Sequence, residues 1–178
     1  YSSIGHMGYA LVGLAAGTAQ GIAGVAVYLA IYLVTTLGTF ALILSMRRDG
    51  KAVEDIADLA GLSRSQPLAA FGLSMLLFSL AGIPPLAGFF GKLYVFLAAV
   101  EAKMFVLAVL GVLASVVGAF YYIRIVKVIY FDEPAAALDR PSIEQKVVFA
   151  MASVFVLVFV VFGNGITSAA SAAAKTFF

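Results

Sequence analysis

The sequence contains no cysteine and a single histidine, His6. Without thiolates the chain cannot ligate an iron–sulfur cluster, and with one imidazole it cannot hold a haem between two histidines. Charged residues are also scarce, because only 11% of the 178 residues are Asp, Glu, Lys or Arg, against about a quarter in soluble domains. We therefore expect no bound cofactor in this chain and place any electron transfer elsewhere.

Signatures of nucleotide and nucleic-acid binding are missing too. There is no dinucleotide-binding fingerprint, and Gly91-Lys92 is not part of a P-loop because the first glycine of that motif would fall on Leu86. The net charge of +2 is too small to argue for a nucleic-acid partner. Nucleotides and nucleic acids are thus not expected as ligands.

Apolar residues dominate instead. They make up 63% of the chain, and the mean hydropathy is +1.10. A water-soluble domain of this size could not bury so much apolar surface, since much of a small domain's area stays exposed. The lipid bilayer is the expected solvent. Because the chain starts at Tyr1, without an initiator Met and without a signal-peptide pattern, we also expect it to be truncated at its N-terminus.

Five apolar stretches approach the roughly 20 residues that a membrane helix needs to cross about 30 Å of hydrocarbon. They cover residues 4–19, 21–46, 68–100, 104–130 and 147–166, the last with a weaker Ala/Ser-rich end. Two longer polar connections, 47–66 and 131–146, hold most of the charge. The sequence predicts an all-α integral membrane protein, with residues 1–178 forming one domain of about five transmembrane helices.

The distribution of basic residues predicts the orientation of this bundle. Eight of the eleven fall on one predicted side: Arg47, Arg48, Lys51, Arg64, Arg124, Lys127, Arg140 and Lys146. By the positive-inside rule, the 47–66 and 131–146 connections are cytoplasmic. Tyr1 then starts on the cytoplasmic side, and Phe178 ends outside.

The 47–66 connection carries apolar residues near helical spacing among Glu54, Asp55 and Asp58. This pattern predicts a short amphipathic helix at the interface. Such a helix is either a solvated loop helix or a docking surface for a partner subunit.

Small residues and aromatic residues predict how the helices pack. Gly13, Gly17 and Gly21 form a small-xxx-small pattern that favours close helix contact, and Ser74, Ser79, Gly111, Ser115 and Gly118 extend it. Tyr121, Tyr122, Tyr130 and Phe131 are typical of an aromatic belt at the cytoplasmic interface, with Arg124 and Lys127 beside them.

The 68–100 stretch is too long for one straight helix, since 33 residues would run about 50 Å. Gly82-Ile83-Pro84-Pro85 interrupts it, because two prolines remove two backbone donors and clash with preceding carbonyls. We expect a discontinuous helix at Gly82, Pro84 and Pro85. Breaks of this kind occur at ion and substrate sites in transporters, where half-helix ends supply partial charges.

Lys92 is the only charged residue between Arg64 and Glu101. Nine residues separate it from Glu101, so at helical rise it lies about 13 Å inside the boundary, near the midplane. A cation there is costly and therefore a functional candidate. Burial favours the neutral amine, which suits a group that accepts and releases a proton. The alternative is a lysine that snorkels or serves as a packing counter-ion.

His6 lies within two turns of the start of the first stretch and has an unperturbed pKa near neutral. It is either a proton relay or a buried histidine held by hydrogen bonds. Tyr28 and Tyr32, one helical turn apart, either line a polar face or belong to the core or the lipid-facing surface.

Two stretches, YSSIGHMGY at 1–9 and LAGIPPLAGFFGKLYVF at 80–96, make the chain resemble the antiporter-like membrane subunits of respiratory complex I. The resemblance implies a 14-helix inner-membrane subunit of bacteria, of which these helices are the last five. It implies that Lys92 matches the ionisable residue at the outward end of a buried relay, and that His6 matches the histidine of the central hydrophilic axis.

The same resemblance implies a function as a proton-translocating subunit of NADH:quinone oxidoreductase in the respiratory chain. The other membrane subunits and the lipid bilayer would be its partners, while FMN, iron–sulfur clusters, NADH and quinone would lie in other subunits. The earlier broken helix and its relay residues would lie upstream of Tyr1, so this part would hold the outward half-channel. Two alternatives remain: a subunit of a cation/proton antiporter or membrane-bound hydrogenase, or a structural membrane scaffold.

Overall fold

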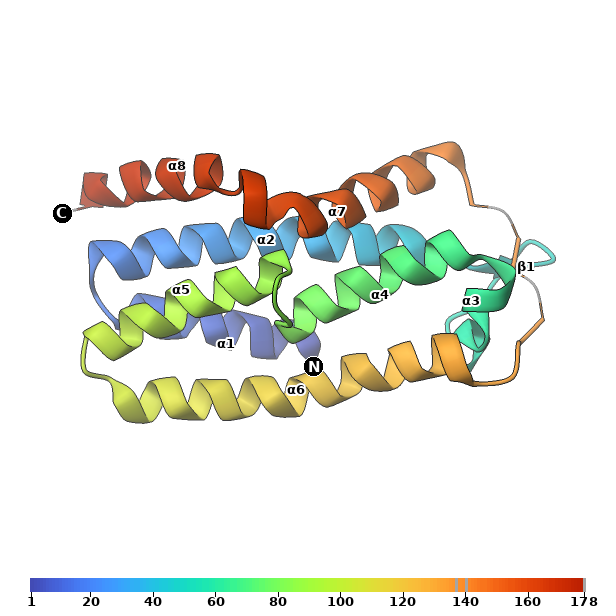
Figure 1. Cartoon of the computed structure of the whole chain (residues 1–178), viewed down its shortest axis with the longest axis horizontal. Helices are drawn as coiled ribbons and strands as arrows, with labels where there is room; N and C mark the ends of the chain where they lie inside the picture. Colours follow the sequence, from blue (N-terminus) through green and yellow to red (C-terminus); the bar gives the residue numbers. More distant parts are fainter. Residues whose placement is uncertain (137, 140, 178) are drawn as a thin grey trace.

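The chain forms a bundle of helices that run along a common long axis in the computed structural model, which describes residues 1–136, 138–139 and 141–177 (Figure 1). The described helices are α1 (Ser2–Ala15), α2 (Ala19–Ile43), α3 (Leu62–Ser65), α4 (Pro67–Ala81), α5 (Ala87–Glu101), α6 (Phe105–Phe131), α7 (Ile143–Phe162) and α8 (Asn164–Ala174). Two short antiparallel strands, β1 (Arg47–Arg48) and β2 (Lys51–Ala52), and 3-10 turns at Ile56–Leu59 and Lys175–Phe177 complete the described elements.

Three described helices, α2, α6 and α7, are each long and apolar enough to cross a membrane. The predicted third stretch is divided into α4 and α5, of 15 residues each, and the chain between them crosses from one half-helix to the other (Figure 1). The predicted all-α membrane fold with one discontinuous helix is therefore confirmed. The fifth predicted stretch, 147–166, lies in α7 and the start of α8, which meet at Gly163-Asn164.

The core of the bundle is built around α2, which packs against α1, α4, α5, α7 and α8. Its side chains Val27 and Ile31 are buried together with Leu76 of α4 and Val156 of α7. By contrast, α6 leaves most of its apolar side chains exposed. An apolar surface of this kind suits lipid or other membrane helices rather than water.

Close packing at small residues is confirmed for two of the three predicted glycines. A Cβ on Gly13 would lie 2.7 Å from Val25 and 2.9 Å from Val95, and a Cβ on Gly21 would overlap the Gly13 carbonyl. Gly17 was wrongly assigned to this contact, because it lies in the turn between α1 and α2 with no neighbour close by. The first helix consequently ends at Ala15, before the predicted residue 19.

The single amphipathic helix predicted within 47–66 is wrong. Asp49 and Gly50 both have positive φ and form the turn of the β1–β2 hairpin, as Asp-Gly commonly does. Only a 3-10 turn and the four-residue α3 follow before Pro67 starts α4. The hairpin takes up residues 47–52, and Gly61, which has a positive φ, separates the 3-10 turn from α3, so no continuous helix forms.

The two polar connections bind each other at one end of the bundle. Arg48 forms an ion pair with Asp58 at 3.0 Å and donates to the Ala136 carbonyl, while the Gly50 amide donates to Asp139. The Asp139 amide in turn donates to the Arg47 carbonyl. This contact supports the prediction that both connections share one side of the membrane. Arg140 and Phe178, which the orientation argument also used, lie outside the described residues.

Single-cysteine labelling tests the orientation. In the full-length protein, cysteines at the exposed positions Glu54 and Glu133 are expected to react with a membrane-impermeant maleimide only in inverted vesicles, and one at Lys175 only in intact spheroplasts. The described residues supply no competing cysteine. Labelling of both connections from the periplasmic side would contradict the orientation.

Candidate functional site

The break between α4 and α5 leaves backbone groups without helical partners in the middle of the bundle. Gly82 ends α4 in the left-handed conformation, which glycine adopts without strain, and its amide donates to the Phe78 and Ser79 carbonyls. The Ile83 amide also donates to Phe78. The carbonyl of Ala81 has no such partner, because the residue four positions ahead is Pro85, which lacks an N–H group.

Lys92 supplies the missing donor. Its Nζ donates to the Ala81 carbonyl at 2.9 Å, so the ammonium lies at the negative end of the α4 half-helix. It also donates to Oγ of Ser115 on α6 at 2.7 Å and lies 4.9 Å from the ring centroid of Tyr9. The side chain is 7% exposed and forms none of the ion pairs among the described residues. Lys92 therefore points inward rather than snorkelling.

A second contact holds the two half-helices together. Ser79 on α4 accepts a hydrogen bond from the Gly88 amide near the start of α5 at 3.0 Å. A Cβ at position 88 would overlap the Ser79 carbonyl, so glycine is needed for this close approach. The Ser79–Gly88 contact fixes the distance between the Ala81 carbonyl and the helix that carries Lys92.

His6 lies at the centre of a cluster of tyrosines. Its Nδ1 is 2.6 Å from the hydroxyl of Tyr28, and its Nε2 is 3.1 Å from the hydroxyl of Tyr122. Tyr32 stacks on the imidazole at 4.7 Å between centroids, and Ser2 is hydrogen-bonded to Tyr122. Both ring nitrogens of this buried histidine thus have a hydroxyl partner that can donate or accept.

The position of Tyr122 contradicts the predicted aromatic belt, and the position of Tyr28 decides between the alternatives given for it. Tyr122 is not part of an interfacial belt, because it turns inward to His6, whereas Tyr121 and Phe131 are exposed. Tyr28 is both a core residue and a member of the polar cluster. A signal for Tyr122 was present in the sequence: seven residues separate it from Ser115, a spacing that places both side chains on one face of α6.

A small cavity joins the histidine cluster to Lys92. It has a volume of about 10 Å³, close to the minimum that holds one water molecule. Its polar lining includes His6, Tyr28, Thr35, Ser79 and Lys92. Tyr9 lies edge-on to His6 and faces the Lys92 ammonium, so it spans the same gap. The site can thus keep a proton-binding amine, an imidazole and several hydroxyls in one continuous polar region.

Within the described part of the chain, no group of three His, Asp or Glu side chains could hold a metal ion. What the site offers is a titratable amine at a half-helix terminus inside a membrane bundle. These features define the class of multi-pass membrane proteins in which a broken helix carries a buried ionisable residue.

The chain belongs to the NADH:quinone oxidoreductase/Mrp antiporter transmembrane family, whose model matches residues 1–118. It is 59% identical to NADH-quinone oxidoreductase subunit N 1 of Rhizobium meliloti and 60% identical to subunit N of Azorhizobium caulinodans, each match covering 100% of this chain. The chain spans 37% of the length of these relatives. The predicted resemblance is confirmed, and the chain is a multi-pass protein of the bacterial inner membrane.

Solved structures agree with this assignment. A chain of respiratory complex I from Thermus thermophilus with bound aureothin matches with a TM-score of 0.81 at 30% identity, covering 94% of this chain and 38% of that chain. A chain of the Mrp complex from a Dietzia species matches with a TM-score of 0.78 at 21% identity, covering 95% of this chain and 40% of that one. The second match shows that this chain and the Mrp complex chain share a fold.

Proposed function

We propose that the full-length protein is a proton-translocating membrane subunit of NADH:quinone oxidoreductase and that the described helices carry its outward half-channel. In this proposal other subunits bind NADH, FMN, the iron–sulfur clusters and quinone, and the neighbouring membrane subunits are partners. The observation that carries the proposal is the Lys92 ammonium on the Ala81 carbonyl, 2.9 Å away, at the break of the membrane helix. The 59% identity to NADH-quinone oxidoreductase subunit N 1 of Rhizobium meliloti also supports the proposal.

In the proposed mechanism, Lys92 binds a proton from inside and releases it outward. The Ala81 carbonyl and the Ser115 hydroxyl stabilise the ammonium, because both present oxygen to Nζ. After deprotonation the neutral amine still donates to one oxygen and can accept from the other partner, the hydroxyl. The Ala81 carbonyl and the Ser115 hydroxyl therefore hold the side chain in place in both protonation states.

His6 is the proposed donor to Lys92. In the neutral ring one tyrosine hydroxyl accepts from His6 and the other donates to it, while in the charged ring both accept. Protonation of His6 thus requires only the hydroxyl that donates to the neutral ring, that of Tyr28 or Tyr122, to rotate so that it accepts. A single water in the adjoining cavity would complete the path to Lys92.

Two other functions share part of this support. A subunit of a cation/proton antiporter or membrane-bound hydrogenase would use the same buried lysine without NADH chemistry, and the Mrp likeness is one of fold. A structural scaffold would keep Lys92 only as a hydrogen-bond partner of Ala81. The first alternative predicts proton transfer at Lys92 that is not coupled to quinone reduction, and the scaffold predicts quinone reduction that is independent of Lys92.

The matched pair Ser115→Ala and Ser115→Thr tests the proposal. Alanine removes the hydroxyl partner of Lys92, whereas threonine keeps it. A hydrogen bond to a charged group contributes about 1.5–3 kcal/mol, so we expect Ser115→Ala to slow NADH-driven proton pumping and coupled quinone reduction by about tenfold or more. Ser115→Thr should retain most of both rates. Unchanged pumping in assembled Ser115→Ala complexes would contradict the relay, and unchanged quinone reduction alone would favour an alternative.

A further inference from the structure

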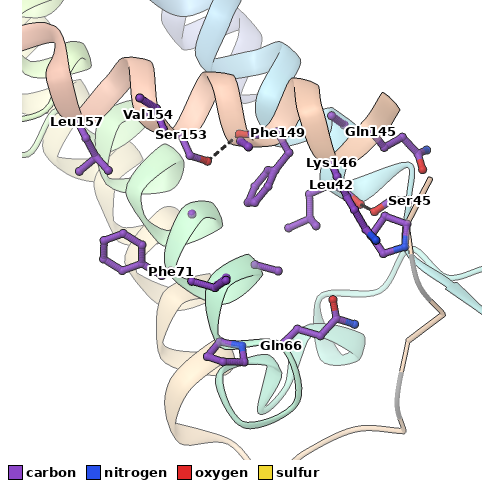
Figure 2. A pocket seen from close by; sticks show the side chains of 17 residues that line it. Leu42, Ser45, Gln66, Phe71, Gln145, Lys146, Phe149, Ser153, Val154 and Leu157 are labelled. Carbon is purple, nitrogen blue, oxygen red and sulfur yellow. Dashed lines mark hydrogen bonds between the residues drawn. The ribbon is translucent and has the colours of Figure 1, made fainter. Parts of the chain in front are cut away.

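A second, much larger cavity lies between the starts of α4 and α7 and the end of α2 (Figure 2). We name it the α4–α7 groove. Its volume is about 630 Å³, within the range of about 300–1,000 Å³ typical of small-molecule sites. It shares no lining residue with the cavity around Lys92. The proton path proposed above therefore does not account for the groove.

The groove is amphipathic along its length. Phe71, Phe149, Val154 and Leu157 form apolar walls, and Figure 2 shows Val154, Leu157 and Phe71 at one end of the view. Toward the other end lie Ser45, Gln66, Gln145 and Lys146, of which Ser45 donates to the Leu42 carbonyl and Gln145 accepts from the Ser142 amide. Ser153, a further polar residue of the lining, lies beside Val154 and donates to the Phe149 carbonyl. Such a cavity suits a ligand with a long apolar part and a polar head.

Among the described residues that line the groove, Lys146 is the one that carries a charge. It forms none of the ion pairs found among the described residues. It lies in the first turn of α7, next to the connection predicted to be cytoplasmic, so its ammonium is at headgroup level. The polar head that fits this end of the groove is an anion.

The length of the groove matches one leaflet of the bilayer. Eleven residues of α7 separate Lys146 from Leu157, which corresponds to about 16 Å at helical rise. Half of a hydrocarbon core of about 30 Å has nearly the same depth. The depth of the groove therefore matches an acyl chain of that leaflet.

We propose that the α4–α7 groove binds an anionic phospholipid of the leaflet on the loop side. One acyl chain lies against Phe71, Val154 and Leu157, and the phosphate is held by Lys146 with the amide of Gln66. Basic pockets between membrane helices on the cytoplasmic side bind anionic headgroups in this way. The proposal does not depend on proton translocation.

Photolabelling of the assembled complex tests this site. The complex is reconstituted in phosphatidylcholine vesicles with trace phosphatidylglycerol that carries a diazirine on one acyl chain, and adducts are mapped by peptide mass spectrometry. We expect adducts on residues 67–72 and 149–157. Lys146→Gln should reduce them about fivefold at limiting lipid, from the contribution of one basic residue near the surface. Lys127→Gln, which removes a cation from α6 on the same side, is the matched control and should leave them unchanged.

A second variant separates the acyl chain from the headgroup. Ala150 is an exposed residue of the groove wall, and Ala150→Trp should fill the groove and abolish the adducts while Lys146 remains. Absence of adducts in the wild-type complex would overturn the proposal and show that another protein segment covers the groove. Equal labelling by a matching diazirine phosphatidylcholine, with no effect of Lys146→Gln, would overturn it in favour of ordinary boundary lipid.

Discussion

Replacement of Lys92 by methionine is expected to reduce NADH-driven proton pumping and coupled quinone reduction at least tenfold in assembled complexes. Methionine has nearly the length of lysine but cannot bind a proton, so the proposed path between the histidine cluster and the outside loses its titratable amine. The Ala81 carbonyl also loses its donor, although a water molecule in the cavity can replace it. Pumping is followed as acidification of inverted vesicles alongside NADH:quinone reductase activity.

Assembly provides the control for this result. Lys103→Met removes a cation from the connection between α5 and α6 and should leave pumping unchanged. Complex content is measured by native gel electrophoresis and by electron transfer from NADH to ferricyanide, which does not require the membrane part. Wild-type pumping in the Lys92→Met variant would exclude the relay and leave the scaffold interpretation.

Pro85→Ala is expected to lower pumping several-fold while the complex still assembles. An alanine at position 85 restores the N–H group that bonds the Ala81 carbonyl in a continuous helix, and so it competes with Lys92 for that oxygen. Pro84→Ala restores only the donor for Leu80, so its effect should be smaller. The double variant Pro84→Ala/Pro85→Ala should allow α4 to propagate through the gap and have the largest effect of the three.

The three variants are compared by proton pumping per quinone reduced. Competition for the Ala81 carbonyl predicts that the double variant is the most impaired, Pro85→Ala less so, and Pro84→Ala least. Normal pumping in the double variant would mean that the discontinuity is dispensable. Equal effects of the two single variants would mean that competition for the Ala81 carbonyl is not the cause.

The sequence predicts the helix break and singles out Lys92 because both signals depend on local chemistry, and the relay role of Lys92 stays a prediction. Pro84 and Pro85 end a helix in any context, and a lone charge in 36 residues of apolar sequence stands out without a structure. The boundaries of α4 and α5 consequently lie within one residue of the predicted stretch.

The partners of Lys92 could not be predicted in the same way. Ala81 offers only its backbone carbonyl, and Ser115 and Tyr9 come from other helices whose rotation is set by packing. Tyr122 was misassigned because its position near the end of α6 is typical of interfacial tyrosines, while the face on which it lies depends on α1. The helix predicted within 47–66 does not form because weak periodicity cannot carry a helix through the Asp49-Gly50 hairpin and the left-handed Gly61.

The most direct test of proton transfer at Lys92 compares Lys92→Arg with Lys92→Glu in assembled complexes, measured as proton pumping against quinone reductase activity. Arginine keeps the positive charge but does not deprotonate at accessible pH, so it can occupy the site without passing a proton on. A buried carboxyl reverses the charge but can bind and release a proton near neutral pH. The relay predicts that glutamate recovers more pumping than arginine. Full pumping with arginine would contradict it and make Lys92 a fixed electrostatic gate.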